Sequence, residues 1–154
     1  MVCGSDWHLH MTEHVLVPFD GSPLSRRALE RVLASQPGAH VTLLHVVDPV
    51  GVIYESETRG LPDGETWFER RRADAEELLA EAVELAADLD PGREVDTAVE
   101  VGSPARAILD YVDDHDVDHV VMGSHGRSGV SRLVFGSVAE RVMRQSPVAV
   151  TVVR

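Results

Sequence analysis

Short apolar runs alternate along this chain with longer segments in which apolar residues recur every three or four positions. The short runs are rich in valine and leucine and are bounded by Gly, Pro or Asp, which is typical of buried β-strands. They predict strands over residues 14–19, 41–47, 95–101, 117–122 and 148–153. The longer segments predict helices that start near Pro23, Thr66, Pro104 and Val138. Ser22 is the expected N-cap of the first helix, with Pro23 at its first position.

The alternation of strands and helices predicts an α/β fold, in which one doubly wound sheet of five parallel strands has helices on both faces. The strand at 95–101 alternates apolar and polar residues, so we expect it near a sheet edge. In a strand order of 3-2-1-4-5, the ligand crevice lies beyond the carboxyl ends of strands one and four. The turns that follow these strands are 20–22 and 123–129. We therefore expect both turns to build one shared site.

The length of 154 residues fits a single domain, which we expect over residues 14–154 after a flexible tail at 1–13. The tail lacks the basic and apolar regions of a signal peptide, and no apolar run approaches the length of a membrane span. The single cysteine, Cys3, has no disulfide partner within the chain. These features predict a cytoplasmic protein. The irregular segment 48–65 is typical of a functional loop, such as a lid, or of partial disorder.

The charge balance excludes several kinds of partner. The chain has 26 acidic and 14 basic residues, a formal net charge of −12, and every basic residue is arginine. So acidic a surface disfavours nucleic acid and anionic membranes. Because salt screens self-repulsion, we hypothesise a salt-loving host. The absence of lysine also excludes the Gly-x4-Gly-Lys-Ser/Thr loop, whose lysine contacts the terminal phosphates of ATP.

The glycine-rich stretch 123–129, followed by Gly136 and Ser137, lies between a predicted strand and a predicted helix. Glycines let backbone N–H groups approach an anion, and a helix N-terminus offers unpaired N–H donors. A phosphate cradle is our leading interpretation, and a turn that packs closely on the sheet is the alternative. We expect Ser137 to be the N-cap of the last helix. Arg127 is expected to neutralise phosphate charge unless it is a solvated surface residue, and Arg132 is a weaker candidate for the same role.

Other polar residues have competing interpretations. Asp20 is placed to hold ribose hydroxyls or a divalent cation, or else to cap the following helix. Ser124 and His125 are adjacent in a loop and are not expected to face each other. The pair His115 and His119 fits an acidic surface better than a metal site, and His45 is expected in the core. No general base is evident near a γ-phosphate, which favours binding over turnover.

Three motifs resemble the ATP-binding branch of the universal stress protein family. They are Gly-x2-Gly-x9-Gly-Ser from Gly123, Val-Pro-Phe-Asp-Gly-Ser from Val17 and Leu-Leu-His-Val-Val-Asp from Leu43. The resemblance covers 14–154 and implies an adenine-nucleotide alpha-hydrolase-like, Rossmann-like fold with strand order 3-2-1-4-5. It also implies ATP as ligand, with magnesium or manganese, and a homodimer formed through Val148 to Val153.

The same resemblance assigns site residues by position. It places Pro18, Asp20 and Val46 around the adenosine, Met122 and Gly123 on the ribose side, and Gly126, Arg127, Gly136, Ser137 and Val138 on the phosphate side, with Gly129 in the same loop. Asp20 would also contact a metal ion bound to ATP. We therefore predict an ATP-binding stress-response regulator in which binding matters more than turnover. The alternatives are a slow ATPase or nucleotide-dependent transferase, and a nucleotide-free dimeric interaction module; the downstream protein partner is not named by the sequence.

Overall fold

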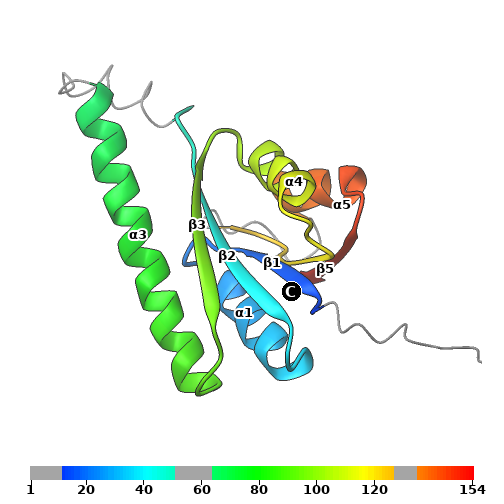
Figure 1. The fold of residues 1–154 in the computed structure, drawn as a ribbon. Helices are drawn as coiled ribbons and strands as arrows, with labels where there is room; N and C mark the ends of the chain where they lie inside the picture. The colour runs from blue at the N-terminus through cyan, green and yellow to red at the C-terminus, as the bar shows by residue number, and fades with distance from the viewer. Residues whose placement is uncertain (1–11, 51–63, 127–134) are drawn as a thin grey trace, which may run out of the picture.

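The computed structural model describes residues 12–50, 64–126 and 135–154, in which strands alternate with helices (Figure 1). The strands are β1 (His14–Pro18), β2 (His40–Val47), β3 (Val95–Val101), β4 (His119–Gly123) and β5 (Ala149–Val153). The helices are α1 (Pro23–Ser35), α3 (Gly64–Leu89), α4 (Pro104–Asp114) and α5 (Ser137–Gln145). Each strand and helix predicted from the sequence is present, with small shifts at the ends.

The strands form one parallel sheet in the order β3-β2-β1-β4-β5, as predicted. β1 lies at the centre, where it pairs with β2 from His14 opposite His40 to Pro18 opposite Leu44, and with β4 on its other side. β3 is an edge strand, which confirms the expectation drawn from its polar positions. The order reverses between β1 and β4, so the crevice predicted from topology belongs at the carboxyl ends of these two strands.

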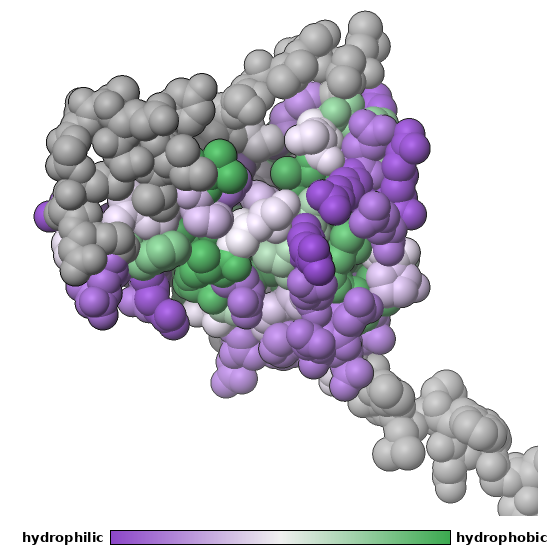
Figure 2. All heavy atoms as spheres, turned by 90° about the horizontal axis from the view of Figure 1, so that it is seen from above, coloured by the Kyte–Doolittle hydropathy of each residue, from purple (hydrophilic) through white to green (hydrophobic). Residues whose placement is uncertain are grey.

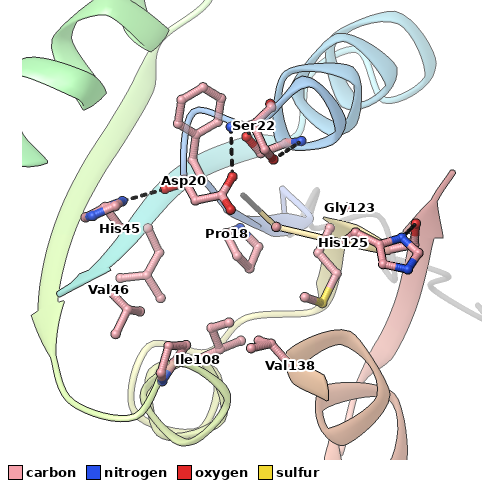
Figure 3. Close-up of a pocket in the computed structure, with 16 residues that line it drawn as sticks. Pro18, Asp20, Ser22, His45, Val46, Ile108, Gly123, His125 and Val138 are labelled. Carbon is pink, nitrogen blue, oxygen red and sulfur yellow. Dashed lines mark hydrogen bonds between the residues drawn. The ribbon is translucent and has the colours of Figure 1, made fainter. Parts of the chain in front are cut away.

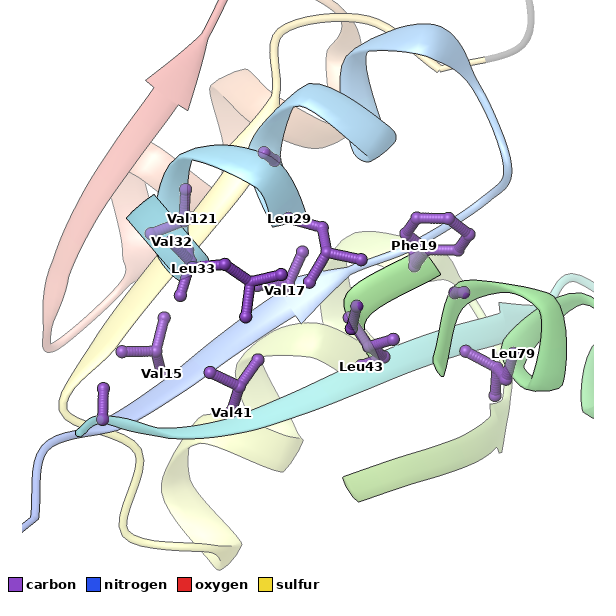
Figure 4. Close-up of a cluster of buried hydrophobic side chains, with 14 residues drawn as sticks. Val15, Val17, Phe19, Leu29, Val32, Leu33, Val41, Leu43, Leu79 and Val121 are labelled. Carbon is purple, nitrogen blue, oxygen red and sulfur yellow. The ribbon is translucent and has the colours of Figure 1, made fainter. Parts of the chain in front are cut away.

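Successive residues of the central strands face opposite sides of the sheet and enter two separate cores. Val15 and Val17 of β1, with Leu43 of β2, pack against α1 and α3 (Figure 4). Leu16 of β1 and Leu44 of β2 instead join the core beneath α4 and α5. All five of these side chains are almost fully buried. The mainly apolar sequences of β1 and β2 thus arise because helices cover both faces of the sheet.

Helix α1 starts as the sequence predicts. Ser22 is its N-cap, with its hydroxyl accepting a hydrogen bond from the Ser25 N–H at 3.2 Å, and Pro23 occupies the first turn. The cap fixes where the chain leaves β1 and enters the helix, so it also fixes the turn at Asp20 and Gly21 between them.

The predicted tail and the predicted lid fall largely outside the described residues, because 1–11 and 51–63 are not part of them. Glu13, at the end of the predicted tail, already belongs to the fold, since its carbonyl accepts a hydrogen bond from the His40 N–H at 2.8 Å. Within 12–50, 64–126 and 135–154, no helix combines the length and apolar character needed to cross a membrane.

Candidate functional site

A cleft opens at the carboxyl ends of β1 and β4, beside the end of β2 and the helices α4 and α5 (Figure 3). It contains about 690 Å³ of space, part of which is open to solvent. Figure 2 looks down on the side where β2 and β3 end, and shows apolar side chains in the middle of this face with hydrophilic ones around them.

Seven of the residues proposed from the sequence line this cleft. They are Pro18, Asp20, Val46, Met122, Gly123, Gly126 and Val138. Gly136 and Ser137 lie at the start of α5, immediately before Val138. Arg127, Gly129 and Arg132 lie outside the described residues. The turns after β1 and β4 both contribute residues to this cleft, and that it is a binding site stays a prediction.

One end of the cleft is apolar. Pro18 and Val46 from the first two strands face Ile108 of α4 and Val138 of α5 across it (Figure 3). The sequence reasoning missed Ile108, and with it Pro104, which stands four positions earlier on α4. Positions 104 and 108 lie on the same face of α4, but only the crossover that lays α4 over the ends of the strands brings that face to the cleft.

Asp20 stands at the other end of the cleft and is half-buried. Its Oδ1 accepts a hydrogen bond from the Ser22 N–H at 2.9 Å. Gly21 between them has φ of +78°, a left-handed conformation that favours glycine. Because Ser22 is the N-cap of α1, Asp20 does not cap that helix and instead stabilises the turn before it.

Gly126 brings the glycine-rich loop against Asp20. A Cβ atom at position 126 would lie 2.8 Å from Asp20 Oδ2, closer than real Cβ contacts allow. Gly123 has a different neighbour, because a Cβ there would lie 2.7 Å from Leu24 Cβ and 3.1 Å from the Leu24 carbonyl carbon of α1. The first glycine thus lets the end of β4 pack on α1, and the second lets the loop approach the carboxylate.

The start of α5 corrects one expectation. Its N-cap is Gly136 and not Ser137, which is the first helical residue and is exposed. The Gly136 N–H donates to the Ser124 carbonyl at 2.7 Å, and Gly136 has the extended backbone conformation of an N-cap. The helix therefore begins one residue earlier than the sequence pattern indicates. Among the described residues no side chain caps α5, and the N–H groups of its first turn point to this part of the cleft as donors for an acceptor.

Ser124 and His125 do face each other, contrary to the expectation from the sequence. The buried Ser124 hydroxyl lies 3.0 Å from His125 Nδ1. His125 Nε2 is buried and has no hydrogen-bond partner among the described residues. In a catalytic serine–histidine pair a third group orients the second ring nitrogen. The described residues provide no such third group for His125 Nε2.

The other histidines lie elsewhere than the sequence suggests, or have structural partners. His45 lines the cleft and is only half-buried, so its assignment to the core was wrong; its Nδ1 donates to the Phe19 carbonyl at 2.8 Å. His115 stacks on Tyr111, and the His119 ring contacts Thr151 Oγ1 at 2.8 Å. Among the described residues, no group of three or more histidine, cysteine or acidic side chains is arranged to hold a metal ion.

Comparisons with known proteins agree with this architecture. The family model described as "Universal stress protein family" matches residues 11–154. Universal stress protein YxiE of Bacillus subtilis is 31% identical over 150 residues, which cover 94% of this chain and 100% of the relative. The solved structure of MJ0577, a universal stress protein of Methanocaldococcus jannaschii, has a TM-score of 0.77 and 28% identity over 93% of this chain and 96% of its own. A universal stress protein from Archaeoglobus fulgidus, solved in complex with dAMP, has a TM-score of 0.62 and 23% identity over 93% and 98% of the two chains.

Proposed function

The chain belongs to the universal stress protein family, and from this premise we propose that it binds ATP in the cleft between β1 and β4 and acts as a stress-response regulator. The observation that carries the proposal is the contact of Gly126 with Asp20 at the polar end of a cleft whose other end is apolar. An adenine nucleotide has the same division, with an aromatic base at one end and phosphates at the other. The A. fulgidus relative, solved with dAMP, adds support from the same fold.

The apolar end fits the base. Pro18, Ile108 and Val138 offer surfaces on which a flat ring packs. β1 ends opposite Leu44, whose carbonyl accepts a bond from the Phe19 N–H at 2.8 Å. Backbone groups along a strand point alternately to its two neighbours, so the N–H and C=O of Val46, like those of Leu44, point to the side of β1. β1 has already ended at this level of the sheet. The Val46 groups offer one donor and one acceptor to the edge of a base.

The polar end fits ribose and phosphates. The Asp20 carboxylate is an acceptor for ribose hydroxyls, and Gly126 leaves space beside it. The first-turn N–H groups of α5, at Ser137 and Val138, are donors for phosphate oxygens, and the helix dipole favours negative charge there. Arg127 follows Gly126 directly in the sequence and supplies positive charge to the same loop in this proposal.

Magnesium or manganese enters this proposal with the nucleotide. The described part of the chain has no preformed cluster of metal ligands, and Asp20 is the only carboxylate among the described residues that line the cleft. One carboxylate together with phosphate oxygens is a usual way to bind Mg²⁺. The metal would neutralise phosphate charge beside an acidic protein, and Asp20 would hold either this ion or the ribose.

Binding is tested first by analysing the small molecules released when the purified protein is denatured, and then by calorimetric titration with ATP. We expect ATP to bind, and Asp20→Asn to weaken it by roughly 10–100-fold, as the loss of hydrogen bonds to a charged group predicts. Asp88→Asn, an equal change of charge at an exposed position of α3, should leave the affinity unchanged. An empty site that takes up no ATP would show that the proposal is wrong.

Turnover is tested separately by single-turnover hydrolysis of bound ATP. We expect no chemistry that Asp20→Asn removes, because the described residues place no oriented general base in the cleft. Hydrolysis in the parent protein that disappears in the variant would favour the alternative, a slow ATPase.

We also propose a homodimer formed through β5. This strand is an edge of the sheet, paired only with β4 among the described strands, and its valines are half-buried. An unpaired edge favours pairing with a second copy around a two-fold axis. Light scattering during size-exclusion chromatography should give twice the monomer mass of 16.8 kDa; the monomer mass at all concentrations would exclude this dimer.

A further inference from the structure

His45 holds the peptide group from which Asp20 projects. Beyond the end of β1, the Phe19 N–H still donates to the Leu44 carbonyl of β2 at 2.8 Å. The Phe19 carbonyl accepts from the ring of the next β2 residue, His45 Nδ1, also at 2.8 Å. In a regular parallel ladder that carbonyl would take a backbone N–H of β2. The imidazole therefore replaces a ladder bond where the chain turns away at Asp20.

The same peptide group connects His45 to the carboxylate. The Phe19 carbonyl belongs to the bond that leads directly into Asp20, and Figure 3 shows His45 reaching this part of the chain from β2. The Asp20 side chain is held at one oxygen by the Ser22 N–H at 2.9 Å. Its second oxygen faces Gly126. His45 holds the Phe19–Asp20 peptide group, and the Ser22 N–H holds Oδ1 of the Asp20 side chain. Together these two bonds determine the direction in which Oδ2 points.

The bond also fixes which ring nitrogen carries a proton. A carbonyl only accepts hydrogen bonds, so Nδ1 must carry the proton. A donor at this ring position, and not the charge of the ring, is what the Phe19 carbonyl requires.

We propose that His45 is a positioning residue for Asp20 and that it sets the preference of the cleft for ribose over 2′-deoxyribose. This inference rests on the proposed nucleotide binding. A carboxylate distinguishes the two sugars well only if it is already held at the position of the 2′-hydroxyl. If the carboxylate is mobile, the entropy lost in ordering it offsets the free energy of the hydrogen bond. His45 supplies that rigidity from outside the ligand.

Three substitutions separate this role from simple packing. His45→Leu removes the donor and keeps an apolar side chain of similar size. His45→Asn keeps an N–H donor attached to Cγ, where Nδ1 is attached, whereas His45→Gln moves the donor one carbon further out. The measured quantity is the ratio of the dissociation constants of 2′-deoxy-ATP and ATP, which a uniform loss of stability or of base packing leaves unchanged.

In the parent protein we expect a ratio of about 10 or more, the value of one hydrogen bond to a charged group. His45→Leu and His45→Gln should reduce it to roughly 1–3, and His45→Asn should retain it within about threefold. Asp20→Asn should also reduce it, and adding His45→Leu to that variant should change it no further, because the histidine acts through Asp20.

A parent-like ratio in both His45→Leu and His45→Gln, or a further loss in the double variant, would overturn the positioning role while leaving nucleotide binding intact. Absence of ATP binding in the parent protein would overturn the proposed function and this inference with it. Melting temperatures of all variants show whether each is folded, and His45→Gln provides the comparison if His45→Leu does not fold.

Discussion

Gly123 and Gly126 are glycines for different physical reasons, although they belong to one motif. Neither has a positive φ, so alanine fits the backbone at both positions and only the neighbouring atoms matter. At position 123 an added methyl group meets the backbone and Cβ of Leu24 in α1, which cannot move aside. At position 126 it meets a single side-chain atom, Asp20 Oδ2, which can shift slightly while Oδ1 keeps its bond to the Ser22 N–H.

We therefore expect Gly123→Ala to lower the free energy of unfolding by about 1–3 kcal/mol, the usual effect of overpacking. Gly126→Ala should change it by less than about 0.5 kcal/mol, as surface substitutions do, while weakening ATP binding because it displaces the carboxylate. Urea denaturation and calorimetric titration of both variants measure the two effects. If Gly126→Ala destabilised the fold as much as Gly123→Ala, the glycine-rich loop would be a packing element and not a binding one.

Tyr111 gives a prediction for alkaline pH. Its burial, followed by the nearby carboxylates of Glu100 and Asp96, raises the pKa of its hydroxyl above the ordinary value of 10.0, and a hydrogen bond with Thr42 opposes them. The folded state thus disfavours the phenolate more than the unfolded state does. This stability is fully present below the unfolded pKa and is lost as the pH rises through the folded one.

The variant Tyr111→Phe should accordingly lose less stability than the parent protein when the pH is raised from about 9 to about 11, across the ordinary range of tyrosine titration. Denaturation curves at each pH measure this. An identical alkaline decline in Tyr111→Phe would contradict the prediction.

Single residues show where sequence reasoning reaches its limit. Gly136 and Ser137 are both acceptable N-caps by residue type, and only the bond from Gly136 to the Ser124 carbonyl decides between them. The side-chain contact of Ser124 with His125 depends in the same way on how the loop bends after β4. At such positions the local sequence pattern indicates which residues can be the N-cap or make the contact. Which of them does so depends on a hydrogen bond to a residue distant in the sequence.

At the level of elements, α1 and α4 provide a matched pair of helix starts. Each has a serine at the N-cap followed by proline, but Ser22 accepts a hydrogen bond from the Ser25 N–H and Ser103 makes no side-chain cap bond. Ser22→Ala should therefore destabilise the protein by about 1 kcal/mol, and Ser103→Ala by a few tenths at most. Urea denaturation of both variants gives the comparison. Equal losses would mean that the hydroxyl of Ser22 contributes nothing as a cap.

The elements themselves were the most predictable level of this structure. The strand at 41–47 is mainly apolar because helices cover both its faces, and the alternation at 95–101 indicates an edge strand, in which no residue is fully buried. The carboxyl ends of β1 and β4 follow from topology and locate the cleft. The wall built by Pro104 and Ile108 could not be predicted, because it requires the exact position of α4 above those strand ends.

The whole molecule carries a net charge of −12 without a single lysine, so repulsion among carboxylates opposes the compact state. The described exposed ion pairs on helices, such as Arg72–Glu76, Arg106–Asp110 and Arg144–Glu140, offset little of it. Pairs of this kind contribute about 0.3–0.5 kcal/mol each, and salt weakens them as well. Salt therefore weakens both the ion pairs, which stabilise the fold, and the repulsion among carboxylates, which destabilises it. Because the repulsion involves every carboxylate, its weakening should be the larger effect.

We expect the protein to become more stable as NaCl rises from about 0.1 M to about 1 M, over which the Debye length falls from about 10 Å to about 3 Å. Since each kcal/mol raises the melting temperature by about 2–4 °C at this chain length, a rise of more than about 4 °C is expected.

A variant with Glu77→Gln, Glu84→Gln and Asp88→Asn, three exposed positions of α3, should be more stable than the parent in dilute buffer and respond less to salt. Sucrose, which stabilises compact states without screening charge, should raise the melting temperatures of both proteins equally. A melting temperature that does not change with salt in the parent protein would contradict the salt-loving character inferred from the composition, because screening is the only link between the two.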